Sequence, residues 1–130
     1  MRALATGRLF AKEAGLLAGA WVVPLAFLYN FCDFVFRCGC VSVWAGAADR
    51  CNVHDAAAPH CPWCSHPAGM AGLLVLLLAL DTLVFLGLRT RPALLRVFAG
   101  AAAFFLAGAA AGLGFALAYG YPHFLGFALR

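Results

Sequence analysis

The stretch MAGLLVLLLALDTLVFLGLRTRPALLRVFAGAAAFFLAGAAAGLGFALAY, from Met70 to Tyr119, decides the fold. It holds two long apolar runs, Met70–Leu88 and Ala93–Tyr119, on either side of the short basic turn RTRP. A helix that crosses a bilayer needs about 20 mostly apolar residues, and both runs reach that length. Pro92 cannot extend the helix before it but suits the first turn of the helix after it. The stretch therefore predicts a hairpin of two membrane-spanning helices.

A third apolar run, Ala14–Phe36, precedes this hairpin. It is longer than the apolar core of about 7–15 residues in a secretory signal, so we expect a retained helix. The composition agrees, because 65% of the residues are hydrophobic and 11% are charged, whereas a soluble domain is roughly half apolar. We therefore predict an all-α membrane protein, a single integral domain over residues 1–130. Its three transmembrane helices lie at about 14–36, 70–88 and 93–119, with an outer loop over 37–69.

The basic residues predict the orientation, because Arg and Lys near helix ends are held in the cytoplasm. Six of the nine lie near the start of the chain or around the turn between the last two spans: Arg2, Arg8, Lys12, Arg89, Arg91 and Arg96. The opposite side carries Arg37, Arg50 and Arg130. We expect a cytoplasmic N-terminus, with loop 37–69 and the C-terminus extracytoplasmic. The alanine-rich, lysine-poor composition is typical of GC-rich bacterial genomes and favours a bacterial inner membrane.

The last span contains small residues at a spacing that lets membrane helices approach closely, in GAAAG from Gly108 to Gly112. We interpret this face as packing against the other two spans. Self-association through Gly108 and Gly112, or contact with other membrane proteins, is the alternative. The lipid bilayer is the main expected partner. Nucleic acid is not expected, because the basic residues are scattered and form no basic face.

Four charged residues fall within or at the ends of the predicted spans. Asp81 lies near mid-depth, where an unpaired carboxylate costs about 2.5–3.5 kcal/mol, so we expect it to pair with Arg96 or to act as a proton or cation relay. Asp33 and Arg37 stand four residues apart at the outer end of the first span. We expect their side chains to pair near the headgroups.

All six cysteines and all four histidines lie in the outer segments or at the outer end of the first span. Cysteine packs well as a small hydrophobe, so its absence from the second and third spans is informative. The densest part is HCPWCSH, from His60 to His66. This distribution predicts a Cys/His-rich extracytoplasmic loop that carries the chemistry of the protein.

Metal binding is the interpretation we favour, because thiolate and imidazole are soft ligands and a two-residue spacing lets both face one ion. CPWC and CNVH each have that spacing, so a tetrahedral site would use Cys51, His54, Cys61 and Cys64. The alternates are Cys38, Cys40, His60 and His66. The expected ion is zinc or copper, for metal handling, delivery or electron transfer. We do not expect an enzyme, because the sequence has no catalytic triad pattern and no phosphate loop.

Two other functions use the same cysteines. A membrane thiol–disulfide exchange protein would react through Cys61 and Cys64, with Cys38 and Cys40 as the resolving pair. An accessory subunit of a larger membrane complex would use the six cysteines only as disulfide braces.

Non-covalent haem between histidines is a further alternative, because His123 is expected on the same side of the membrane as the loop. A c-type haem is not predicted, because Ser65 separates Cys64 from His66 and breaks the CxxCH pattern.

Overall fold

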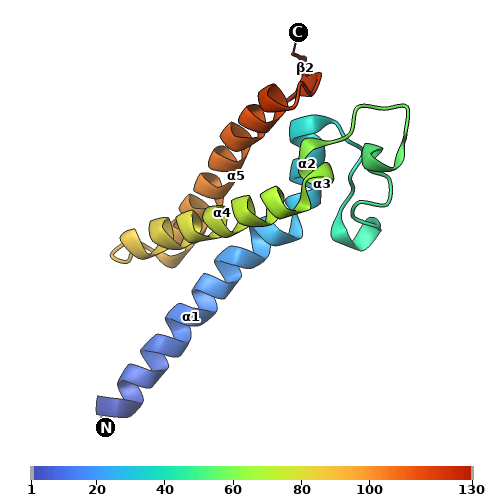
Figure 1. The fold of residues 1–130 in the computed structure, drawn as a ribbon. Coiled ribbons are helices and arrows are strands. Elements are labelled where there is room, and N and C mark those ends of the chain that lie inside the picture. The colour runs from blue at the N-terminus through green and yellow to red at the C-terminus, as the bar shows by residue number, and fades with distance from the viewer. Residues whose placement is uncertain (1, 130) are drawn as a thin grey trace.

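The computed structural model describes the backbone of residues 2–129 and the side chains of residues 11–129. The chain is mostly helical, as the sequence predicts (Figure 1). The α-helices are α1 (Arg2–Ala26), α2 (Leu28–Phe36), α3 (Pro62–Ser65), α4 (Pro67–Gly87) and α5 (Ala93–Ala118). Two short 3-10 helices lie in the loop, η1 (Val43–Ala45) and η2 (Asn52–His54), and a two-stranded antiparallel hairpin follows α5, β1 (His123–Phe124) and β2 (Phe127–Ala128).

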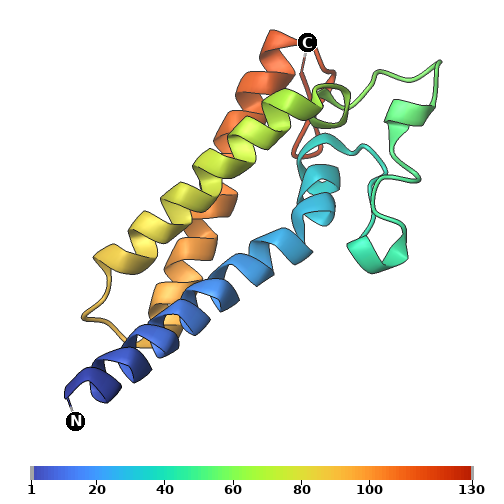
Figure 2. The same ribbon diagram turned by 60° about the horizontal axis from the view of Figure 1, so that its bottom comes forward.

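Helices α4 and α5 are each long and apolar enough to cross a membrane. They lie side by side and are joined by a short turn (Figure 2). Large apolar side chains point outward from both helices, as expected of surfaces that face lipid; they include Val75, Leu76, Leu83, Phe98 and Leu106. The predicted hairpin of two spans is therefore present.

The first predicted span is divided. Residues Ala11–Ala26 and Leu28–Phe36 form two helical segments that meet at an angle of 42°, and together they are long enough for a third span. Pro24 lies inside α1, and the break follows three residues later at Phe27. Proline removes a backbone donor and crowds the preceding turn, which explains a bend here. The helix also begins earlier than predicted, at Arg2.

The glycines of α5 make room for α2. A Cβ atom on Gly108 would lie 2.8 Å from the ring of Phe31, and one on Gly112 would lie 2.8 Å from Val35 Cγ1. Both glycines are buried. The GAAAG face therefore packs within the chain, and Gly108 and Gly112 are not exposed for the self-association that we considered as the alternative.

The predicted pairing of Asp81 with Arg96 is wrong. The Arg96 guanidinium binds the Glu13 carboxylate through two hydrogen bonds, of 2.5 and 3.2 Å, and donates a third to the carbonyl of Phe85 at 3.2 Å. It also lies over the Phe85 ring, 3.9 Å from its centroid. Sequence spacing could not reveal Glu13 as the partner, because the contact joins α1 to α5 across 83 residues.

Asp81 is fully buried, and neither carboxylate oxygen has a hydrogen-bond partner among the described residues. Gly100 of α5 faces it so closely that a Cβ atom there would clash with Oδ1. An ionised carboxylate without a partner is costly in such a place, so Asp81 is expected to be neutral. Whether it relays protons stays an open prediction.

The loop and the C-terminal tail pack together at the end of the helices where α2 ends. The amide of Leu125 donates to the carbonyl of Val35, which ties the tail hairpin to α2. Trp44, at the tip of η1, is 69% exposed and meets Phe27 edge-on at 5.9 Å. The side chains of Arg2, Arg8 and Arg130, which we used for the orientation, lie outside the described part of the chain.

We predict that Glu13→Ala lowers the thermal stability of the detergent-solubilised protein, because Arg96 is 4% exposed and loses the one carboxylate that binds it among the described residues. The loss should be smaller than for a fully buried pair, because Glu13 is half-exposed and water screens it. Glu13→Gln keeps an acceptor and should lose less. In an Arg96→Met background, Glu13→Ala should change little. An equal loss in both backgrounds would contradict the pairing.

Candidate metal centre

All six cysteines meet at the C-terminal end of α2. They come from four separate parts of the chain, namely helix α2 (Cys32), the turn after it (Cys38 and Cys40), the residue before η2 (Cys51), and the start of α3 (Cys61 and Cys64). Five of them are buried and Cys64 is half-buried. Together they form the centre of the outer core, here called the thiol cluster.

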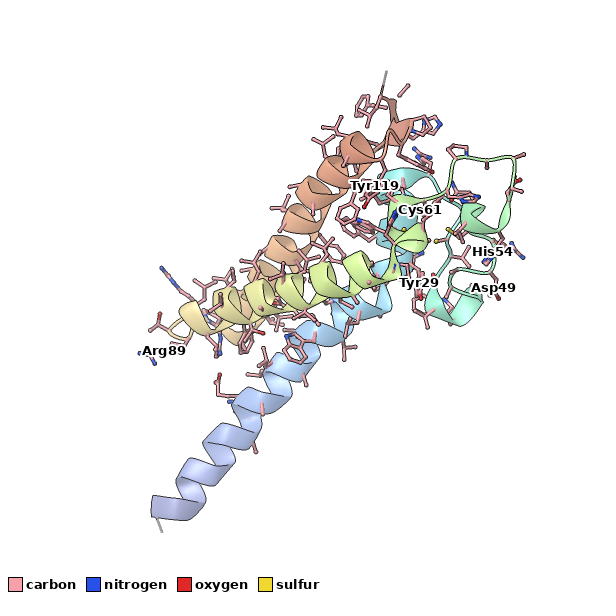
Figure 3. The ribbon with its side chains drawn as sticks, viewed as in Figure 1. Tyr29, Asp49, His54, Cys61, Arg89 and Tyr119 are labelled. Carbon is pink, nitrogen blue, oxygen red and sulfur yellow. The ribbon has the colours of Figure 1, made fainter. Side chains whose placement is uncertain are left out.

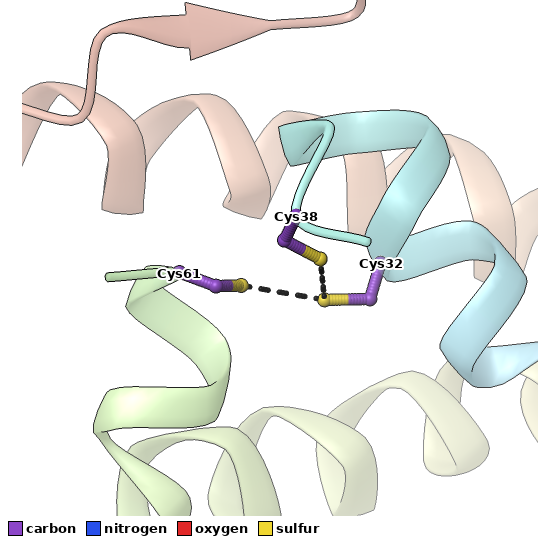
Figure 4. Close-up of side chains that lie close together, drawn as sticks. All are labelled: Cys32, Cys38 and Cys61. Carbon is purple, nitrogen blue, oxygen red and sulfur yellow. Dashed lines mark hydrogen bonds between the residues drawn. The ribbon is translucent and has the colours of Figure 1, made fainter. Parts of the chain in front are cut away.

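The sulfur atoms are close neighbours but are not bonded to one another. The short Sγ–Sγ distances are 3.5 Å for Cys32–Cys38, 3.4 Å for Cys32–Cys61, 3.4 Å for Cys38–Cys40, 3.8 Å for Cys40–Cys64 and 3.3 Å for Cys51–Cys64. Figure 4 shows the first two of these contacts. A disulfide is about 2.05 Å long, and all six cysteines are free. The structure thus gives no support to disulfide bracing of the loop.

A tight turn after α2 positions Cys38 and Cys40. Helix α2 ends at Arg37 in the left-handed region, and Gly39 follows with φ +81°. A Cβ atom on Gly39 would also lie 2.6 Å from the carbonyl oxygen of Arg50, so only glycine fits there. The amide of Gly39 donates to Asp33 Oδ1 at 2.7 Å. The turn therefore brings two cysteines back over Cys32.

The predicted pairing of Asp33 with Arg37 is also wrong. The Asp33 carboxylate accepts from the Gly39 amide, and no ion pair joins it to Arg37 among the described residues. The Arg37 side chain instead lies beside Gly126 of the tail hairpin. The left-handed conformation of Arg37 takes it out of the helix, so the four-residue spacing no longer puts the two side chains on one face.

Asn52 connects the middle of the loop to the tail. Its Oδ1 accepts from the Cys61 amide at 2.9 Å, and its Nδ2 donates to the Pro59 carbonyl at 2.8 Å and to the Tyr121 hydroxyl at 2.7 Å. Its own amide donates to the carbonyl of Cys38. One side chain thus fixes the backbone next to Cys51, Cys61 and Cys38.

Aromatic rings close the inner side of the thiol cluster. Phe36 meets Trp63 edge-on at 5.0 Å and Tyr121 edge-on at 5.5 Å, and all three side chains are buried. Burial raises the pKa of Tyr121 to about 12, so its hydroxyl stays neutral. The rings shield the sulfurs from water on this side.

None of the histidines belongs to a group of ligand atoms that can hold a metal ion in the described part of the chain. Their ring nitrogens are used for backbone carbonyls: His54 Nε2 donates to Ala48, His60 Nε2 to Asp55, and His66 Nδ1 to Pro62. His123 is exposed on the tail. Figure 3 shows His54 out in the loop, away from Cys61 beside the helices. Of the proposed tetrahedral set, the structure brings together Cys51, Cys61 and Cys64.

Sequence reasoning missed Cys32 as a candidate ligand. It lies in the apolar run of the first span, where a cysteine resembles ordinary packing. The useful signal was the short separation in sequence between Cys32 and Cys38. If the helix ends between these two residues, the turn that follows can bring Cys38 back against Cys32. Asp33 and Asn52 were also missed as residues that position the cysteines.

Two cavities reach the thiol cluster, one with a mostly apolar wall and one with a polar wall. One of about 380 Å³ is mostly apolar and touches Cys32 and Cys64, with Tyr29, Val53 and Met70 in its wall. The other, of about 440 Å³, is open and polar and touches Cys38 and Cys51. Its wall includes Arg37, Asp49, Arg50 and Asp55. The cluster is therefore buried but can be approached by a small ion.

The cluster can hold a metal ion, because it contains sets of three thiol sulfurs that lie within 4.8 Å of one another. Burial raises the pKa of Cys51 to about 11. Hydrogen bonding by neighbouring thiols, Cys32 first, lowers the pKa of Cys38 and Cys64. A bound metal ion replaces the thiol protons, so binding requires their release.

No family model matches the sequence, and no curated protein or solved structure is detectably similar to it. Function is therefore inferred from the thiol cluster and its surroundings alone. A similar fold would not by itself have identified the activity, because function depends on the site.

We predict that Asp33→Ala increases the rate at which a maleimide labels Cys38 and Cys40, measured by peptide mass spectrometry on the metal-free protein. The change removes the acceptor for the Gly39 amide, and a hydrogen bond of about 1 kcal/mol corresponds to roughly a fivefold change in the open population. Asp33→Asn keeps Oδ1 and should label at nearly the wild-type rate. Equal acceleration by both variants would contradict this role for Oδ1.

Proposed function

We propose that this protein binds a soft or borderline transition metal, zinc or copper, through its thiol cluster at the outer face of a bacterial inner membrane. Its role is to handle or deliver the metal. The observation that carries the proposal is the convergence of all six cysteines, from four parts of the chain, with sulfur atoms 3.3–3.8 Å apart. Thiolate sulfur selects soft ions such as Cu(I) and also zinc.

The burial of the sulfurs favours metal binding over thiol–disulfide exchange. An exchange reaction needs an accessible thiolate to attack a partner. Cys61 has no exposed surface, and its short contact is with Cys32. Cys64 is half-buried and contacts Cys40 and Cys51. The CPWC pair is thus part of a larger cluster instead of a separate dithiol, which is what a shared metal centre requires.

The surroundings of the thiol cluster give an ion a way in. The outer core holds the sulfurs between α2, α3 and the tail, and the two cavities together touch four of the six cysteines. We infer that the ion is stored or passed on at this site. Electron transfer is a second use of the same cluster if the ion is copper.

We predict that the protein, purified without oxygen in detergent and incubated with Cu(I) or Zn(II), retains stoichiometric metal after desalting, as counted by elemental analysis. Cys61→Ser should retain clearly less, because Cys61 is fully buried among the sulfurs. His54→Ala and His60→Ala are matched loop controls and should keep wild-type amounts. Wild-type protein that retains neither metal would overturn the proposal, and loss of metal in both histidine variants would overturn the all-thiol site.

The proposed orientation has its own test. An alkaline phosphatase reporter inserted after Ala57, at an exposed turn of the loop, should be active, because that enzyme folds only where disulfides form. The matched insertion after Thr90, in the turn between α4 and α5, should be inactive. The reverse result would place the thiol cluster in the cytoplasm.

A further inference from the structure

The six sulfurs of the thiol cluster form a regular pattern of triangles. Four groups of three sulfurs lie within 4.8 Å of one another: Cys32 with Cys38 and Cys61, Cys32 with Cys40 and Cys64, Cys38 with Cys40 and Cys51, and Cys51 with Cys61 and Cys64. Each cysteine belongs to two of these groups. No group contains four sulfurs among the described residues.

This pattern is that of an octahedron. The four groups contain twelve different sulfur pairs, which are the twelve edges, so the octahedron has eight triangular faces. The four groups are four of these faces that share no edge with one another. The three pairs that fall in none of the groups are the opposite corners: Cys32 and Cys51, Cys38 and Cys64, and Cys40 and Cys61. The four faces meet only at corners, so an ion on each face would share every one of its thiolates with one other ion.

Three-sulfur faces favour one ion chemistry over the others. Zinc and iron in thiolate sites take four ligands in a tetrahedron, and every choice of four corners of an octahedron includes at least one opposite pair. Iron–sulfur clusters are held by four cysteines, one for each iron in a [4Fe–4S] cluster and two for each iron in a [2Fe–2S] cluster, so they do not account for six sulfurs in contact. Cu(I) is a soft ion that thiolates select, and three thiolates are enough to coordinate it.

The size of the faces also fits. A triangle with edges of about 4 Å has its centre about 2.3 Å from each corner, which is a normal distance between a thiolate sulfur and a metal ion of this size. Five of the twelve edges measure 3.3–3.8 Å, slightly less than the edges of that triangle, and the other seven lie within 4.8 Å. A small outward movement of the thiols would therefore admit an ion on each of the four faces.

We propose that the thiol cluster takes up four Cu(I) ions as one cage, in which each ion binds the three sulfurs of one face and each thiolate bridges two ions. This rests on the soft-metal function proposed above and names the ion, its number and its ligands. Six thiols lose six protons and four single positive charges enter, so the filled cage carries two negative charges. No electron is transferred, because copper arrives already as Cu(I).

Access to the cluster agrees with such a cage. The polar cavity reaches Cys38 and Cys51, and its wall carries two arginines and two acidic residues, so it has no net formal charge. The apolar cavity reaches Cys32 and Cys64 past Met70, whose thioether is also a soft ligand for Cu(I). The buried rings of Phe36 and Trp63 keep water, and with it oxidation, from the inner faces.

The test is an anaerobic titration of the full-length protein in detergent with Cu(I), followed by native mass spectrometry, X-ray absorption and a pH indicator. We expect saturation at four ions, three sulfur neighbours for each copper with other copper atoms close by, and six protons released for every four ions near neutral pH. Saturation at one or two ions, or four-sulfur coordination, would overturn the cage. It would leave the soft-metal function intact, whereas no retained metal at all would remove that function as well.

A matched pair of variants tests the sharing of sulfurs. Cys51→Ser removes a corner of two of the four faces and should lower the capacity from four ions to about two. Ser65→Ala removes the hydroxyl next to Cys64 and takes away no sulfur, so it should keep four. If Cys51→Ser fails to fold, the wild-type ion count and proton count still decide. A folded Cys51→Ser protein that keeps four ions would contradict bridging by Cys51.

Discussion

The end of helix α2 is the constraint on which the rest of the outer structure depends. The helix must stop at Arg37 and reverse within two residues, because Cys32 is fixed on its buried face while Cys38 and Cys40 have to lie against it. Left-handed Arg37, the positive φ of Gly39 and the Asp33 hydrogen bond achieve this reversal together. One more helical turn would carry Cys38 and Cys40 away from the other sulfurs. Asn52 then fixes the remaining part of the loop to the same place.

The membrane helices support this site from below. Gly108 and Gly112 let α5 approach α2 so closely that Phe31 and Val35 contact the backbone of α5. Trp63, which lies beside the thiol cluster, packs next to Gly112 on the same face of α5. Close packing between membrane helices comes from small residues and leaves few voids. The bend at Phe27 turns α2 away from the axis of α1, so that its outer end lies between the loop and the tail. The helices thus give a rigid base to a loop with little regular structure of its own.

The sequence predicted the helices well because apolar length and the Pro92 turn are local signals. It also predicted that the cysteines and histidines gather in one place, which the six cysteines do and the histidines do not. It did not predict which residues meet, because Glu13 and Arg96 are joined only by the packing of α1 on α5. Spacing rules suggested Asp33 with Arg37 and Cys51 with His54. These rules assume a regular helix or turn. Arg37 is left-handed and so leaves the helix, and the His54 ring is hydrogen-bonded to the carbonyl of Ala48 instead of facing Cys51.

The thiol cluster lies within a packed core, which distinguishes it from sites that a metal ion must assemble. Small zinc-binding domains use the energy of metal binding to fold, since they lack a core of their own. Here the cysteines pack as small hydrophobes beside Phe36, Trp63 and Tyr121, and backbone hydrogen bonds to Asp33 and Asn52 hold the turns without an ion. Little binding energy is then spent on ordering the chain, and preorganised ligands bind more tightly for that reason. Such a core suits the proposed delivery of metal, because the contacts that hold the loop together do not involve an ion.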